Sequence, residues 1–154
     1  MNERPLRVAV LSDTHGVLRP DVYEILKGCD KIIHAGDFDT EEIAQILDEI
    51  APAYIVCGNN DGWWRRGRLE TLRFELEGVR FFLIHNRMAL MEPPEDTDVV
   101  VFGHSHIYCE EKTGGLLWLN PGSCGRRRFR LPLTMAVMTI QNGSYSVEKI
   151  ILEQ

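Results

Sequence analysis

Side chains that commonly bind metal ions recur at the ends of short apolar runs in this 154-residue chain. The runs occupy residues 8–11, 31–33, 54–57, 81–84 and 99–102, and each leads into Asp, Asn or His. In chain order these candidate ligands are Asp13, His15, Asp37, Asn59, His85, His104 and His106. Oxygen and imidazole donors without thiolate favour Mn, Fe, Zn or Ni. Seven ligands are too many for one tetrahedral ion but enough for two if one carboxylate bridges them.

Taken singly, these motifs are weak. Asp13-x-His15 arises often by chance, Gly36-Asp37 also suits an ordinary turn, and a lone His85 is more often a core histidine than a ligand. All five motifs nevertheless occur at the ends of apolar runs, and the alternative needs five loops to acquire these residue types independently. We therefore expect one pocket with two cations, roughly 3.5–4 Å apart, which would generate a hydroxide nucleophile and hold the oxygens of a transferring phosphoryl group.

The elements that must position these residues follow from the hydrophobic pattern. Helical spacing over residues 19–28 and 40–50 alternates with the first three apolar runs, which predicts βαβ units and a parallel sheet. Residues 69–85, 107–119 and 133–152 alternate around glycine-containing turns and predict three hairpins. Two packed sheets with helices outside, in one domain over residues 1–154, would bring the strand ends together.

Bulk properties exclude several classes of function. A net charge of −6 disfavours long nucleic acid and membrane surfaces as partners, although local arginines keep nucleic acid open. Four cysteines form no CxxC pair, and the N-terminal apolar stretch is too short for a signal peptide or a membrane span. We expect a reduced cytoplasmic protein without a membrane anchor; a homo-oligomer remains open.

The motif order DxH…GD…GNxD…H…GHxH resembles the calcineurin-like metallophosphoesterases. The short chain and residues 120–123, Asn-Pro-Gly-Ser, resemble their small phosphodiesterase branch, which also contains the retromer scaffold subunit. The resemblance implies a mixed α/β fold, a four-layer αββα sandwich of two packed mixed β-sheets flanked by helices. It implies two divalent metal ions, with Mn²⁺ favoured over Ni²⁺, Zn²⁺ or Fe. The implied ligands are Asp13, His15 and His106 for one metal, Asn59, His85 and His104 for the other, and Asp37 as the bridge.

The chain departs from the family pattern at Asn60. Many larger members carry a histidine there that is proposed as the general acid, whereas an amide cannot donate a proton by ionising. Losing a general acid costs about 10²–10⁴-fold in rate, which predicts a preference for good leaving groups or for substrates that supply their own acid. Asn60 can still hydrogen-bond a phosphate oxygen. The expected catalytic residues are Asp37, Asn59, Asn60 and His104, and Asp61 is expected to support the ligands.

Two basic clusters are candidate anion sites. Arg126, Arg127 and Arg128 follow the Asn-Pro-Gly-Ser turn, and residues 63–68 combine two tryptophans with three arginines. Arginine suits bidentate phosphate contacts, but a solvated loop or an oligomer contact explains either cluster equally simply. The leading hypothesis is a phosphoesterase that acts on a small phosphodiester through a metal-bridging hydroxide. The alternatives are a phosphomonoesterase and a non-catalytic scaffold of the same fold.

Overall fold

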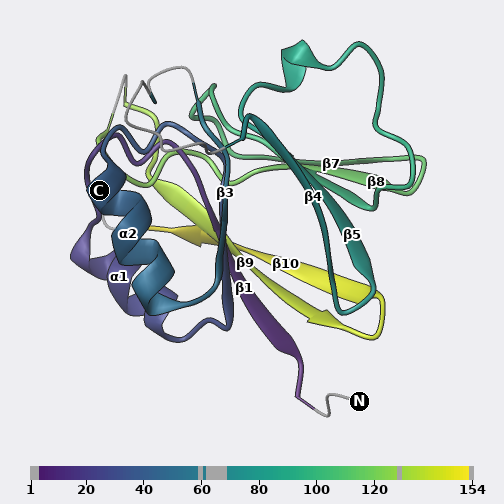
Figure 1. Ribbon diagram of the computed structural model, residues 1–154, viewed down its shortest axis with the longest axis horizontal. Coiled ribbons are helices and arrows are strands. Elements are labelled where there is room, and N and C mark those ends of the chain that lie inside the picture. The colour runs from purple at the N-terminus through teal and green to yellow at the C-terminus, as the bar shows by residue number, and fades with distance from the viewer. Residues whose placement is uncertain (1–3, 59–60, 62–68, 128–129, 153–154) are drawn as a thin grey trace.

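A computed structural model of the chain describes residues 4–58, 61, 69–127 and 130–152 (Figure 1). Asn59, Asn60, Arg128 and the cluster at residues 63–68 lie outside the described residues, so their predicted roles stay predictions. Among the described residues, no helix is long and apolar enough to cross a membrane.

The first sheet has the strand order β10-β9-β1-β2-β3. Its strands are β1 (Leu6–Leu11), β2 (Lys31–His34), β3 (Ala53–Ile55), β9 (Thr134–Gln141) and β10 (Ser144–Ile151). β1 pairs in parallel with β2, and β2 with β3, as the alternation of strands and helices predicted. β9 and β10 form the predicted hairpin, and β9 joins the free side of β1 in antiparallel orientation.

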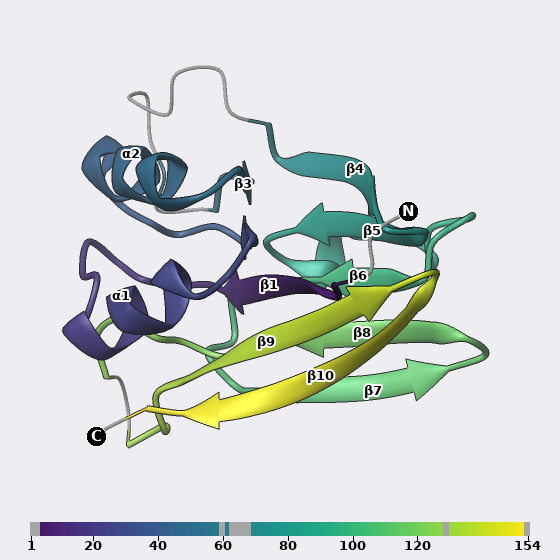
Figure 2. The ribbon, with the colours of Figure 1, turned by 90° about the horizontal axis from the view of Figure 1, so that it is seen from below.

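Two helices cover the outer face of this sheet (Figures 1 and 2). α1 (Pro20–Lys27) begins at the proline expected in its first turn and ends before Gly28. α2 (Glu41–Ile50) begins after the expected N-cap residue Thr40, whose side chain makes no capping hydrogen bond. Both helices turn their apolar residues toward the sheet, so the first half of the chain folds as two βα units.

The second sheet has the strand order β4-β5-β6-β8-β7. Its strands are β4 (Thr71–Leu76), β5 (Val79–Ile84), β6 (Val99–Val101), β7 (Cys109–Thr113) and β8 (Leu116–Asn120). The β4–β5 and β7–β8 hairpins were predicted, whereas the parallel pairs β5–β6 and β6–β8 join segments far apart in the sequence.

Three apolar clusters separate the layers. One lies between the helices and the first sheet, the second lies between the two sheets, and a small third cluster covers the outer face of the second sheet. The expected two-sheet sandwich is confirmed. Among the described residues, however, the outer helical layer on the second sheet is reduced to the single 3₁₀ turn η2 (Arg87–Ala89), whose following residue Leu90 packs on the third cluster.

The sandwich joins the ends of its parallel strands at one edge. After β1 and β2, the amide of Asp13 donates to the carbonyl of Gly36 at 3.0 Å. After β5 and β6, the amide of Gly103 donates to the carbonyl of His85 at 2.8 Å. The two sheets are linked there because the His85 ring lies 2.7 Å, through Nδ1, from the carbonyl oxygen of Ala35. This edge is where four of the five predicted motifs meet.

Candidate metal centre

The loops at this edge hold non-glycine residues in left-handed backbone conformations. Their φ angles run from 47° to 76° at the residues Asp13, His15, Asp37, Asp39, His104 and His106. This conformation costs roughly 1–2 kcal/mol for an L-residue, and such strain accumulates where a site demands a particular side-chain direction. Five of the six are predicted ligands, so the strain coincides with the predicted site.

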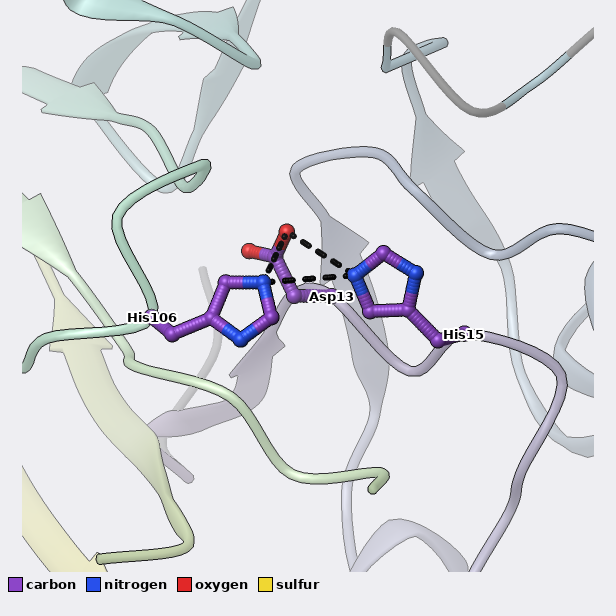
Figure 3. A group of neighbouring side chains, drawn as sticks. All are labelled: Asp13, His15 and His106. Atoms are coloured by element: carbon purple, nitrogen blue, oxygen red, sulfur yellow. Dashed lines mark hydrogen bonds and ion pairs between the residues drawn. The ribbon is translucent and has the colours of Figure 1, made fainter. Parts of the chain in front are cut away.

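One group of donors comes from the loops after β1 and β6. Oδ1 of Asp13 lies 3.3 Å from Nε2 of His106 and 3.7 Å from Nε2 of His15 (Figure 3). The two imidazole Nε2 atoms are 3.3 Å apart. All three side chains are buried, and their donor atoms converge closely enough for one cation.

A second group shares the Asp13 carboxylate. Oδ2 of Asp37 lies 3.1 Å from Nε2 of His85, and Oδ1 of Asp13 lies 3.9 Å from the same nitrogen. Oδ2 of Asp37 is also 3.9 Å from Nε2 of His15, a member of the first group. Both carboxylates therefore lie between the two groups, and Asp37, the expected bridge, lies within 4 Å of a histidine in each.

Buried polar atoms without hydrogen bonds support the fit of a metal. Oδ1 of Asp13 and Nε2 of His85 are both buried and have no hydrogen-bond partner among the described residues. An unsatisfied buried polar atom costs about 1–3 kcal/mol, and more when it is charged. A divalent cation between these atoms would satisfy both of them, and the oxygen and imidazole donor set is one that such ions accept.

The rings are oriented by contacts on their other nitrogens. Nδ1 of His15 lies 3.0 Å from a carboxylate oxygen of Asp39, and Nδ1 of His85 lies 2.7 Å from the carbonyl of Ala35. An acceptor at Nδ1 keeps the proton on that nitrogen and turns the Nε2 lone pair toward the ion. The sequence reading missed Asp39, and the only signal for it was a second carboxylate two residues after Asp37.

Asp61 fastens the loop after β2 to the loop after β3. One of its carboxylate oxygens accepts from the amides of Asp37 and Gly58, and the other accepts from the amide of Asp39, each at 2.8 Å. Burial raises the pKa of Asp61, although these three bonds oppose the rise. With both oxygens engaged in this way, Asp61 supports the neighbouring carboxylates, in line with its expected role.

The turn at residues 120–123 supports the loops on the other side. The amide group of Asn120 donates to the carbonyl of Gly103 at 3.1 Å, and the hydroxyl of Ser123 donates to the carbonyl of Asp13 at 3.0 Å. Gly103 must lack a side chain because a Cβ there would overlap the side chains of Ser12 and Asp13. The turn therefore holds the first and last motifs against each other, as the sequence suggested.

Charge within the site is concentrated on Asp13. Burial alone would raise the pKa of its carboxyl, but the neighbouring rings of His106 and His15 hold the pKa well below its usual range. The carboxylate is therefore ionised at neutral pH. An ionised, buried carboxylate is a strong ligand for a hard cation.

His34 is fully buried behind the site and stays neutral. Burial lowers its pKa to about 4. The amide of Gly36 donates to its Nδ1 at 3.0 Å, so the proton resides on Nε2, which lies 3.0 Å from the hydroxyl of Thr14. His34 thereby joins the loops that carry Asp13 and Asp37, and with both ring nitrogens engaged in this way it supports the site rather than ligating a metal.

The other predicted residues that the structure describes, His104, Arg126 and Arg127, lie outside the two donor groups. His104 is exposed; its ring packs edge-on against His85 with centroids 5.3 Å apart, and its amide donates to Oδ2 of Asp13. Arg126 and Arg127 are exposed and follow Gly125, whose backbone lies directly against Thr14. His104 thus adjoins the second group, and the arginines start beside the first.

Comparison with known proteins agrees with this geometry. Residues 6–143 match the model of the calcineurin-like phosphoesterase superfamily domain. A probable metallophosphoesterase of Mycoplasma pneumoniae is 36% identical over 131 residues, covering 76% of this chain and 78% of the relative. A phosphodiesterase of Methanocaldococcus jannaschii is 25% identical over 170 residues, covering 96% and 100%.

Among solved structures, vacuolar protein sorting 29 from Cryptosporidium parvum superposes with a TM-score of 0.78 at 18% identity, covering 99% of this chain and 100% of that one. At that sequence identity, the structural similarity is evidence for a shared fold only. The match of the family model over most of the chain, together with the donor groups at its strand ends, shows that this chain belongs to the calcineurin-like phosphoesterase superfamily.

Proposed function

We propose that this protein is a two-metal phosphoesterase that hydrolyses small phosphodiesters in preference to phosphomonoesters. The observation that carries the proposal is the pair of adjoining donor groups that share Asp13, with Oδ2 of Asp37 within 4 Å of a histidine in each. A relative named as a phosphodiesterase supports the choice of reaction.

The residues have distinct roles in this proposal. Asp13, His15 and His106 would hold one divalent ion. Asn59, His85 and His104 would hold the other, and Asp37 would bridge the pair. Bound ions of this kind, Mn²⁺ being the favoured metal, supply an activated water as nucleophile and neutralise negative charge on the phosphoryl oxygens.

The chain's own residues orient the site and bind the anion. Asp39 and the carbonyl of Ala35 orient the two ligand rings through Nδ1, which leaves the Nε2 atoms to hold bound ions. Arg126, Arg127 and Arg128 would bind the non-bridging phosphoryl oxygens. Asn60 would hydrogen-bond an oxygen of the substrate but supply no proton, which restricts turnover to esters with good leaving groups.

The test is hydrolysis of bis(p-nitrophenyl) phosphate and p-nitrophenyl phosphate with Mn²⁺, compared with Ni²⁺, Zn²⁺ and Mg²⁺. We expect the diester to be preferred and metal-dependent, and Asp37→Ala and His104→Ala to lose at least 100-fold in kcat/KM. Asp96→Asn, which changes an 89% exposed carboxylate outside the donor groups, is the matched control and should retain activity. Equal activity in all four proteins would refute the proposal.

A non-catalytic scaffold is the second candidate, favoured by the missing histidine at Asn60 and by the structural likeness to vacuolar protein sorting 29. The two candidates differ in turnover rather than in metal binding. Stoichiometric Mn²⁺ binding by calorimetry, together with no turnover of either ester, would favour the scaffold.

A further inference from the structure

A pocket of about 500 Å³ opens beside the second donor group, within the roughly 300–1,000 Å³ range of pockets that bind small molecules. His85 and His104 form the wall that faces the candidate metal centre. The remaining lining residues come from the end of β3, the start of β4, and the segment after β5. They are Cys57, Gly58, Glu70, Thr71, Ile84, Asn86, Ala89 and Leu90.

The η2 segment builds the outer wall of this pocket. The side-chain oxygen of Asn86 accepts from the amide of Met88 at 3.0 Å and so caps the turn. Arg87 does not line the pocket, and its guanidinium lies over the ring of Trp118 at 4.3 Å. This wall of the pocket therefore presents Ala89 and Leu90.

The chemistry of the lining selects the group that fits. Of the ten lining residues, all within the described part of the chain, none is lysine or arginine, so the lining supplies no ammonium or guanidinium to pair with a phosphate or a carboxylate. An uncharged ring would gain contacts with Ile84 and Leu90. The basic residues Arg126 and Arg127 instead start beside the first donor group.

We infer that this pocket binds one ester substituent of the substrate, an uncharged aromatic group such as an aryl ring or a nucleobase, while the phosphoryl group lies at the metal centre. The inference rests on the proposed function and deepens it by naming the substrate class. His85 and His104 separate the two subsites, so the ester bond would cross between them. Anionic substituents such as further phosphates are disfavoured on this side.

Binding of two non-hydrolysable anions to the Mn²⁺-loaded protein tests the inference. Phenylphosphonate and methylphosphonate share the phosphoryl part and differ in the ring. We expect calorimetry to show phenylphosphonate binding about tenfold more tightly to the wild type, because the ring buries apolar surface. Ala89→Phe, which fills the pocket from the exposed turn, should reduce this advantage to less than about threefold. Met88→Phe is the matched control, since Met88 is 83% exposed on the same turn and does not line the pocket.

The charge of the pocket gives a second measurement. 4-Carboxyphenylphosphonate should bind about threefold more weakly than phenylphosphonate, because the lining residues offer its carboxylate no cationic partner. Equal binding of phenyl- and methylphosphonate, an unchanged ratio in Ala89→Phe, or preferred binding of the carboxylated ring would each overturn the inference. The proposed function has a separate readout, because methyl p-nitrophenyl phosphate would still be hydrolysed if only the aromatic subsite were wrong.

Discussion

Asp61 offers the sharpest test of how the site is held together. Replacing it with alanine removes three bonds that join Asp37, Asp39 and Gly58 to one carboxylate. Each buried donor left without a partner costs about 1–3 kcal/mol, so the unrelaxed loss is about 3–9 kcal/mol. Two effects reduce that loss. Water can reach the half-buried Gly58, and removing the Asp61 carboxyl also removes the cost of burying it, the same cost that raises its pKa. We expect Asp61→Ala to lower the free energy of unfolding by about 3–5 kcal/mol.

The isosteric change Asp61→Asn separates the effects of charge and hydrogen bonding on the free energy of unfolding from the effect of side-chain volume. Asp61→Asn keeps the size of the side chain but places an NH₂ donor against at least one backbone N–H. We expect it to lower the free energy of unfolding by about 2 kcal/mol. Both variants should also weaken Mn²⁺ binding about 10–100-fold, because Asp37 and Asp39 lose their common anchor.

The assay is urea unfolding followed by circular dichroism, with EDTA present so that bound metal does not contribute. Asp98→Ala is the control, since the Asp98 carboxylate also accepts a backbone N–H, that of Arg80, but at the surface. It should cost about 1 kcal/mol or less. If Asp61→Ala is no more destabilising than Asp98→Ala, the three bonds do not hold the loops together and the reasoning is wrong.

Three further changes probe other parts of the site. His34 has a pKa of about 4 in the folded protein and stays neutral above that pH, whereas in the unfolded chain it takes up a proton near its ordinary pKa of about 6.5. The free energy of unfolding should therefore fall by up to about 3 kcal/mol as the pH drops between these two values. The decrease should be smaller in His34→Gln. Gly58→Ala places a Cβ against a carboxylate of the site and should weaken Mn²⁺ binding at least about tenfold by calorimetry. The double change Arg126→Ala and Arg127→Ala should raise KM for an aryl phosphodiester about tenfold and leave kcat within about twofold.

Each of these three predictions has a control or a result that would contradict it. Parallel pH–stability curves for wild type and His34→Gln would show that the histidine is not kept neutral by burial. Gly28→Ala, where a new Cβ meets only ordinary contacts, is the control for the Gly58 change and should leave metal binding intact. An unchanged KM in the double arginine variant would remove those residues from the substrate site.

The sequence alone predicted most of the local structure. Apolar runs with helical segments between them predicted β1, β2, β3 and both helices, and alternation around glycine turns predicted the three hairpins. These patterns are local, since they depend on spacings of two or about 3.6 residues. On the outer face of the second sheet, the described segment after β5 forms a single 3₁₀ turn before Pro93-Pro94.

The supporting contacts were harder to foresee. Asp39 against His15 and the carbonyl of Ala35 against His85 join residues from different loops, and one of these partners is a backbone atom with no sequence signature. The pocket beside the second donor group was likewise not predictable from the sequence, because its lining is drawn from four separate segments. Nothing in the spacing of those segments indicates that they are neighbours.

The sequence by itself determined which functional groups are available, namely carboxylates and imidazoles placed within five residues of the ends of buried strands. It could do so because residue type and short-range periodicity are written directly in the chain. Only the tertiary structure decided how those groups meet. The antiparallel docking of β9 on β1 and the parallel pairing of β6 with β8 bring distant loops to one edge, where they hold Asp13 and His106 in left-handed conformations. Such strain persists only when surrounding contacts over-determine it, and those contacts are long-range.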